Sequence, residues 1–334
     1  MAYVMFNRII QVVVFLAAST LCIIAYAQNY PSRTVRIVVP FPPGAHASAV
    51  GADHPASAMT QRCTVCGSET RLSHRATVLS RFDVAYLYCS QCGLLQTEEP
   101  HWLDEAYSDA IALSDTGLLT RNIAVAMRLT ALLTFAFPRG VRGVDAGGGY
   151  GVLTRLMRDI GFDFYWSDPF CANLFAKGFE ADRTGGSFSV ITAFEVMEHV
   201  HDPIGFIRQA VTKYDGSAFA FSTQLFDGSP PPLDWPYYSF ETGQHISFYQ
   251  RRTLRRIADA LGMRLFSSGH FHLITSHDLS PGLFRLCTSR LAFGLFPLMK
   301  LLQRSRTWPD RQRAMAELRR QATADDAAAS RTPG

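Results

Sequence analysis

The glycine-rich stretch at residues 144–151 constrains the fold of this chain more than any other feature. Apolar residues lead into Asp145, and glycine then occurs at every second position, at Gly147, Gly149 and Gly151. This pattern predicts a strand, a tight turn and the beginning of a helix, because the backbone must bend sharply and approach a ligand with no Cβ in the way. The G-x-G-x-x-G spacing of a dinucleotide site is not met. The turn therefore indicates a different ligand, or else only a corner between a strand and a helix.

The segment after the turn predicts a pair of parallel strands. A helix over residues 152–160 would connect the first strand to a short second strand that ends at Asp168. Ligands of such sheets bind outside the carboxyl ends of the strands. Asp168 could accept hydrogen bonds from both hydroxyls of a ribose there, although Asp-Pro at 168–169 is also typical of a turn or a helix N-cap.

Two later segments make a family resemblance specific. Residues 195–203 read E-x-x-E-H-x-x-D-P, and residues 244–263 carry a histidine followed by an aromatic pair and a T-L segment. Together with D-x-G-x-G-x-G at residues 145–151, they resemble class I S-adenosylmethionine (SAM)-dependent methyltransferases, close to the ubiquinone O-methyltransferases and many sugar methyltransferases. The resemblance covers residues from about 60 to 275 and keeps the family's order of segments.

The resemblance implies a fold and a set of site residues. The expected fold class is α/β, a Rossmann-like doubly wound sheet with an antiparallel edge and a small N-terminal zinc module. The expected donor-binding residues are Asp145, Gly147, Gly149, Gly151, Asp168 and Glu195.

Methyl transfer from a sulfonium is an in-line displacement, so the protein mostly supplies alignment and an electrostatic environment. A base is needed only if the acceptor keeps its proton until attack. His199 and His245 are the candidates, although a capping or buried structural role suits His199 equally. The resemblance also allows a divalent ion at Glu195, Glu198 and His199.

Four cysteines form the second strong pattern. Cys63-x-x-Cys66-Gly and Cys89-x-x-Cys92-Gly predict two knuckles that hold one tetrahedral, structural Zn²⁺. Disulfides or unrelated thiols are the alternatives. A zinc module before a methyltransferase domain also resembles bacterial enzymes that occur with sugar and polysaccharide genes.

The N-terminus conflicts with a reducing compartment. Residues 1–27 are typical of a secretory signal or a short anchor, and this apolar run would allow weak membrane contact. Residues 28–45 resemble the first strand and loop of periplasmic receptors of tripartite tricarboxylate transporters, and residues 46–58 are linker-like. Reduced thiols and SAM belong to the cytosol. We therefore expect a cytoplasmic catalytic module that begins near Met59, after a fused or mis-started segment.

The expected domains are 59–105 for the zinc module, 106–275 for the methyltransferase domain, and 276–334 for C-terminal helices and a polar tail. One or two helices are expected over residues 107–137, and an apolar helix over 283–302 packs on the domain or lies on a membrane surface. The expected strands are 141–145, 162–167, a weak one near 179–181, 189–194 and 218–222, with a hairpin after Met263. The expected helices are 152–160, 171–177, 204–213 and 252–261.

The favoured acceptor is a small molecule such as a sugar or a nucleotide sugar. The aromatic loop at residues 230–241 suits such a ligand, unless its rings only pack the loop. An RNA methyltransferase with a zinc ribbon is one alternative, but a net charge of +4 and scattered arginines give no clear nucleic-acid site. A periplasmic receptor fragment fused to a methyltransferase that no longer catalyses is another.

Overall fold

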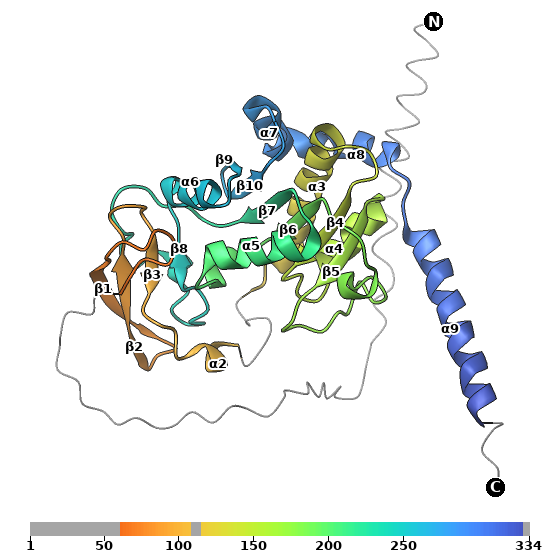
Figure 1. Cartoon of the computed structure of the whole chain (residues 1–334), viewed down its shortest axis with the longest axis horizontal. Coiled ribbons are helices and arrows are strands. Elements are labelled where there is room, and N and C mark those ends of the chain that lie inside the picture. The colour runs from red at the N-terminus through yellow and green to blue at the C-terminus, as the bar shows by residue number, and fades with distance from the viewer. Residues whose placement is uncertain (1–60, 108–114, 330–334) are drawn as a thin grey trace, which may run out of the picture. The chain divides into compact units, whose positions relative to one another are not determined.

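The structure, a computed structural model, describes residues 61–107 and 115–329 of the chain (Figure 1). The signal-like segment at 1–27 and the receptor-like and linker segments at 28–58 lie outside these residues.

The main sheet has six strands in the order β5-β4-β6-β7-β10-β9. Its members are β4 (Arg142–Ala146), β5 (Asp163–Ser167), β6 (Val190–Ala193), β7 (Ala218–Ser222), β9 (Arg264–Ser268) and β10 (Phe271–Thr275). The first four are parallel, and β10 pairs antiparallel with both β7 and β9. All residues of β6 and β7 are buried, as expected for strands covered on both faces. The predicted doubly wound sheet with an antiparallel edge is confirmed.

Helices cover both faces of this sheet (Figure 1). They are α3 (Leu118–Ala136), α4 (Val152–Ile160), α5 (Pro203–Tyr214), α6 (Arg251–Ala260), α7 (Pro281–Thr288) and α8 (Leu291–Leu302). Residues of β7 alternate between two cores: Phe219 and Phe221 pack with α5 and α6, whereas Ala218 and Ala220 pack with α3, α4, α7 and α8. The alternation follows from the period of two along a strand.

Among the described residues, α3 alone is long and apolar enough to cross a membrane. Its residues Leu129, Leu132 and Leu133 are buried against α4, α7 and α8. This helix is therefore built as a core helix of the domain.

A second, antiparallel sheet contains the cysteine module. Its strands are β1 (Arg71–Val78), β2 (Phe82–Tyr88), β3 (Leu95–Thr97) and β8 (Ser247–Phe248), in that order. The short helix α2 (Leu103–Ala106) follows β3. Because β8 comes from the later part of the chain, the cysteine module and the larger domain share a sheet. The indole of Trp102 adds a hydrogen bond of 2.8 Å to the carbonyl of Gly243.

Three predicted elements are wrong. The single helix predicted over residues 283–302 is divided into α7 and α8. Residues 171–177 form turns and not a helix, because the side chain of Asn173 accepts from the amide of Ala176 and donates to its carbonyl, at 2.9 and 2.8 Å. The weak strand near 179–181 is reduced to one bridge, between Trp166 and Glu180, and a short 3₁₀ turn, η1 (Ala181–Arg183).

The last helix, α9 (Thr307–Ala329), docks through its first turn. Asp310 is nearly buried and accepts two hydrogen bonds, of 2.7 and 2.8 Å, from the guanidinium of Arg158 in α4. The following turns of α9 up to residue 323 are exposed.

Candidate functional site

The glycine turn joins β4 to α4 beside the end of β5. Gly147, Gly149 and Gly151 all have left-handed backbones, with φ of 75°, 52° and 87°. The amide of Gly147 donates to the carbonyl of Ser167 at 2.8 Å, which holds the turn against β5. A Cβ added at Gly147 would meet Val196 at 2.9 Å, whereas one at Gly149 would point into open space. Gly149 thus leaves room for ligand atoms at the surface of the turn.

Asp168 lies against this turn, directly after β5. One carboxylate oxygen accepts from the amide of Gly149 at 2.9 Å, and the other accepts from the amides of Phe170 and Cys171 at 2.8 and 3.0 Å. The indole of Trp166 donates to the carbonyl of Gly149 at 2.7 Å. The carboxylate therefore fixes the turn itself.

Asp145 ends the first strand and is buried. Its carboxylate accepts a hydrogen bond of 2.6 Å from the hydroxyl of Thr192 in β6. Burial raises the pKa of Asp145 to about 7, and the nearby Asp168 adds to the shift. A cation beside it would favour the ionised form.

Glu195 occupies a strained corner at the end of β6. It has a left-handed φ of 56°, which is unusual for a residue with a side chain. Ser222, at the end of β7, holds it twice: the hydroxyl donates to its carboxylate at 2.6 Å and accepts from its amide at 2.7 Å. Arg121 of α3 lies 3.2 Å from the other carboxylate oxygen and is also paired with Asp115. Strain of this kind is concentrated at ligand sites and active sites.

His199 and His245 come together although they are distant in sequence. Their ring centroids are 4.9 Å apart in an edge-to-face arrangement. The Nδ1 atom of His199 is 2.9 Å from the carbonyl of Gln244, and that of His245 is 2.6 Å from the carbonyl of Tyr237. A carbonyl only accepts, so each neutral ring carries its proton on Nδ1 and leaves Nε2 as the acceptor. Burial lowers the pKa of both histidines, which favours the neutral forms.

Glu198 is the third titratable group of this corner. It is buried, and among the described residues its Oε2 atom has no hydrogen-bond partner. Burial raises the pKa of Glu198 to about 7. One ligand atom each from Glu198, His199 and His245 lies within 4.8 Å of the others, so these three could hold a cation. The candidate ligands for a divalent ion are therefore Glu198, His199 and His245, whereas the sequence predicted Glu195 in place of His245.

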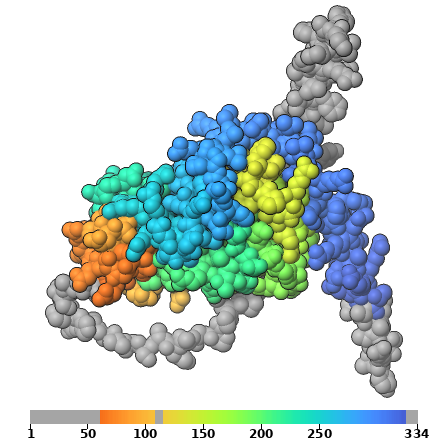
Figure 2. Space-filling model, turned by 45° about the horizontal axis from the view of Figure 1, so that its top comes forward, coloured from red at the N-terminus to blue at the C-terminus, as the bar shows by residue number. Residues whose placement is uncertain are grey.

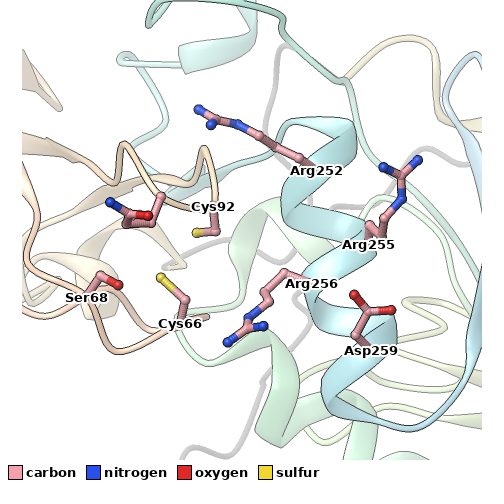
Figure 3. A pocket seen from close by; sticks show the side chains of 8 residues that line it. Cys66, Ser68, Cys92, Arg252, Arg255, Arg256 and Asp259 are labelled. Carbon is pink, nitrogen blue, oxygen red and sulfur yellow. The ribbon is translucent and has the colours of Figure 1, made fainter.

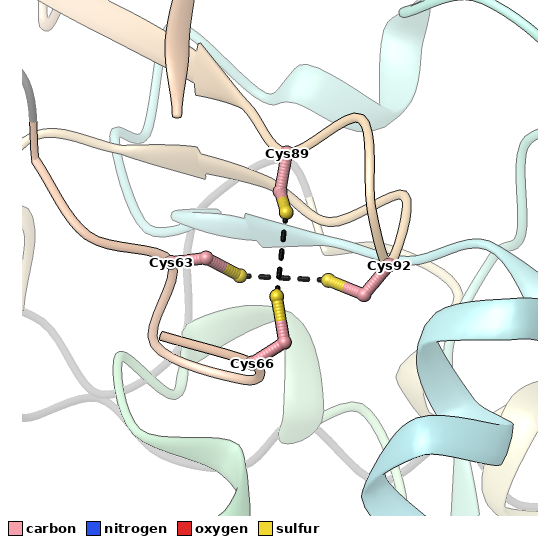
Figure 4. A group of neighbouring side chains, drawn as sticks. All are labelled: Cys63, Cys66, Cys89 and Cys92. Carbon is pink, nitrogen blue, oxygen red and sulfur yellow. Dashed lines mark hydrogen bonds between the residues drawn. The ribbon is translucent and has the colours of Figure 1, made fainter. Parts of the chain in front are cut away.

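The four cysteines converge as predicted. The Sγ atoms of Cys63 and Cys92 are 3.4 Å apart, those of Cys66 and Cys89 are also 3.4 Å apart, and all four lie within 4.8 Å (Figure 4). Four thiolates at about 2.3 Å from a tetrahedral zinc would be separated by about 3.8 Å. The set therefore fits a structural Zn²⁺. The hydrogen bond from the Cys92 thiol lowers the pKa of Cys63.

The two knuckles have matching backbones. Gly67 and Gly93 have φ of 71° and 80°, and their amides donate to the carbonyls of Cys63 and Cys89 at 2.9 and 2.8 Å. The second knuckle is also bonded to the larger domain, since the hydroxyl of Thr253 in α6 donates to the carbonyl of Cys92 at 2.8 Å. The cysteine cluster therefore connects the smaller sheet to α6 of the larger domain.

The aromatic loop at 230–241 divides into two parts. Tyr238 is buried and stacks on Phe240 with centroids 5.0 Å apart, so these rings pack the core of the smaller sheet. Tyr237, within the short turn η3 (Pro236–Tyr238), instead faces the histidines, with its ring centroid 4.8 Å from that of His245. Only the second part fits the expectation of an acceptor pocket.

A surface groove of about 350 Å³ lies elsewhere, between the two cysteine knuckles and α6 (Figure 3). Arg252, Arg255 and Arg256 line it with Asp259. Arg252 is bound to the carbonyl of Ser90 at 3.0 Å, so it serves the contact between the knuckle and α6. The groove is separate from the glycine turn.

One family model matches part of this chain. Residues 120–268 match the family model described as a methyltransferase domain. The chain therefore contains a methyltransferase domain over these residues. A search of curated proteins found no match.

Solved structures resemble this chain over about half of its length. One is magnesium protoporphyrin IX methyltransferase from Synechocystis PCC 6803 with bound S-adenosylhomocysteine (SAH), at 15% identity and a TM-score of 0.34, covering 52% of this chain and 94% of that one. Another is the plantazolicin methyltransferase in complex with SAH, at 12% identity and a TM-score of 0.37, covering 52% and 90%. A third is an O-methyltransferase family 2 protein from Planctomyces limnophilus DSM 3776 in complex with apigenin, at 16% identity and a TM-score of 0.33, covering 50% and 67%.

Sequence reasoning missed several residues that build the candidate site. Thr192, Ser222 and Arg121 hold its acids, and Tyr237 faces its histidines. Thr192 and Ser222 could have been suspected, because both lie at the carboxyl ends of predicted parallel strands. Arg121 carries no such signal, since it lies on a helix before the first strand.

Proposed function

We propose that this methyltransferase transfers the methyl group of SAM to a small-molecule acceptor, and that the acceptor is a sugar, a nucleotide sugar or a related metabolite. The observation that carries the proposal is the convergence, at the carboxyl ends of β4, β5 and β6, of an open glycine turn, three acids and two neutral histidines. A reducing, cytoplasmic location agrees with four free thiols that fit zinc.

The donor is assigned to the glycine turn and the acids around it. The open space above Gly149 would admit the donor, while the carboxylate of Asp168 would accept from its ribose. Asp145 and Glu195 would place negative charge near a positively charged ligand, which matches a sulfonium and an amino group. When bound, SAM supplies an already activated methyl group, so the residues around it mainly orient it.

The acceptor is assigned to the side of the site where His199 and His245 meet. Because each ring donates through Nδ1 to a carbonyl, each Nε2 is free to accept a proton from a hydroxyl or another acceptor group. Glu198 stands beside the pair and stabilises a histidine that becomes protonated. Tyr237 offers an aromatic ring at the same place, which suits a sugar ring or a flat substrate.

The experiment is a transfer assay with radiolabelled SAM and the zinc-loaded chain. The acceptors are a panel of free sugars, nucleotide sugars and flat phenols, with total RNA as the competing class. His199→Asn and His245→Asn are compared with His201→Asn, a nearby histidine that lies outside the pair. We expect transfer to one class of small acceptor, lowered about 100-fold by the first two substitutions and unchanged by the third, with equal SAM affinity in all.

Two results would overturn this assignment. Transfer to RNA, with binding that weakens steeply as salt rises, would assign the site to a nucleic-acid substrate. Full transfer by both histidine variants would remove the proposed base and leave the pair a structural role.

A further inference from the structure

Helix α8 carries apolar side chains on its outer side as well as on its core side. Ala292 and Met299 are buried against α3 and the sheet. The outward stripe is leucine at every turn, with Leu291, Leu295, Leu298 and Leu302 exposed by 62%, 41%, 59% and 67%. A stripe of this kind on a soluble domain marks an interaction surface.

The chain around α8 lacks negative charge. Between Asp278 and Asp310 the sequence contains no Asp or Glu, and it contains five cations. These are Arg285, Arg290, Lys300, Arg304 and Arg306. Within the described residues only Arg306 forms an ion pair, with Asp163 at 3.3 Å. The other four are exposed and available to an anionic partner.

Neighbouring elements extend this surface. The side chain of Gln303 donates to Thr134 at 3.4 Å, which places the end of α8 beside the end of α3, where Phe135 is half exposed. Trp308 follows α8 and is 60% exposed. Figure 2 shows α8 and α3 next to each other on the outside of the molecule.

We propose that this surface, which we call the α8 face (Leu291–Leu302 with its flanking cations), binds the interface of an anionic lipid membrane. A leucine stripe buried among acyl chains, with arginine, lysine and tryptophan at its edges, is the pattern of an interfacial helix. A second copy of the chain fits less well, because a two-fold interface would bring the same cations of both copies together with no acid to balance them. The α8 face lies on the side of the sheet away from α5 and α6, and it does not rest on the proposed acceptor.

The test measures co-sedimentation of the full chain with lipid vesicles. The vesicles are phosphatidylcholine alone or an equal mixture of phosphatidylcholine and phosphatidylglycerol. Every protein tested carries Val14→Asp and Leu16→Asp, so that the N-terminal apolar run contributes no lipid binding. Leu298→Glu is compared with Leu72→Glu, because Leu72 in β1 is exposed to a similar extent, 55%, outside the α8 face.

We expect binding to the anionic vesicles that falls about tenfold in Leu298→Glu, is unchanged in Leu72→Glu, and weakens with added salt. Binding to phosphatidylcholine alone should be much weaker. Equal binding by the two variants, or no binding by the parent protein, would overturn the proposal. A dimer seen by light scattering that Leu298→Glu converts to a monomer would also overturn it and assign the face to a second copy.

Discussion

The cysteine cluster and the histidine corner are both built from residues far apart in the chain, yet they differ in how their groups are satisfied. In the cluster, four sulfur atoms face one another, and glycine amides bond the knuckle carbonyls. In the corner, Glu198 has an orphaned carboxyl oxygen, and no described residue bonds the Nε2 atoms of His199 and His245. A closed set of ligands is typical of a structural metal, whereas unsatisfied titratable groups are typical of a site that meets a ligand.

Removing the metal tests most directly whether the cysteine cluster is a structural zinc site. Cys89→Ser, or a strong chelator, should cause the largest loss of stability, because structural zinc contributes about 10–16 kcal/mol to small modules. We expect the thermal unfolding midpoint to fall by roughly 10 °C or more, with zinc content lost. Cys171→Ser, which lies outside the cluster, is the control. An unchanged midpoint in a zinc-free protein would refute the structural role.

The raised pKa of Asp145, next to the glycine turn, predicts that the free energy of unfolding depends on pH. Asp145 has its pKa raised by burial from an ordinary value of 3.8 to about 7. The folded protein therefore binds this proton more tightly than the unfolded chain, and stability falls as the pH rises from 3.8 through about 7. The loss is about 4 kcal/mol at most.

Asp145→Asn should flatten this part of the profile. Denaturant unfolding at pH 5 and pH 8 measures it, and the variant should lose less stability between the two than the parent protein. If both lose the same amount, Asp145 is not held protonated.

Two glycines with left-handed backbones can be compared to separate an effect on SAM binding from an effect on turn conformation. Gly149 and Gly140 both have positive φ, and a Cβ at either one meets no atom within 4 Å. Gly149→Ala should weaken SAM binding by about 100-fold, roughly 3 kcal/mol, because the new methyl group occupies ligand space. Gly140→Ala should lower stability by a similar amount to Gly149→Ala and keep SAM binding. The shift in unfolding midpoint on adding SAM reads out both. Similar losses of SAM binding in the two variants would place the donor elsewhere.

The smallest expected effect concerns the Asp-Pro end of the E-x-x-E-H-x-x-D-P signature. The carboxylate of Asp202 accepts from the amide of Gly205 at 2.9 Å and caps α5. Asp202→Ala should therefore cost about 1 kcal/mol of stability and leave SAM affinity unchanged. Denaturant unfolding with a parallel SAM titration tests this, and a loss of affinity would show that this part of the signature also serves the ligand.

Local rules explain which parts of the molecule the sequence could predict. The parallel strands, α4 and the knuckles depend on short-range patterns of apolar residues, glycine and cysteine, and each appears where expected. The helix predicted over residues 171–177 is wrong because the side chain of Asn173 forms hydrogen bonds with the backbone that compete with a helix. The pairing of β8 with β3, and the placement of Arg121 against Glu195, depend on tertiary contacts that no local pattern encodes.

The candidate site shows the same division. The turn geometry of Gly147, Gly149 and Gly151 follows from their sequence spacing, and it is confirmed. Their roles in binding, like those of Asp168 and the histidines, stay predictions. The contact between His199 and His245 was not predicted, because the two residues are far apart in the sequence and only the tertiary fold brings them together.

The most direct test is a calorimetric titration of SAM into the zinc-loaded chain and into its Asp168→Ala variant. We expect one site of micromolar affinity in the parent protein and a loss of binding in a variant that still retains zinc and unfolds cooperatively. Equal binding by both proteins, or no binding by a folded and zinc-loaded parent, would contradict the assignment of the donor to the glycine turn.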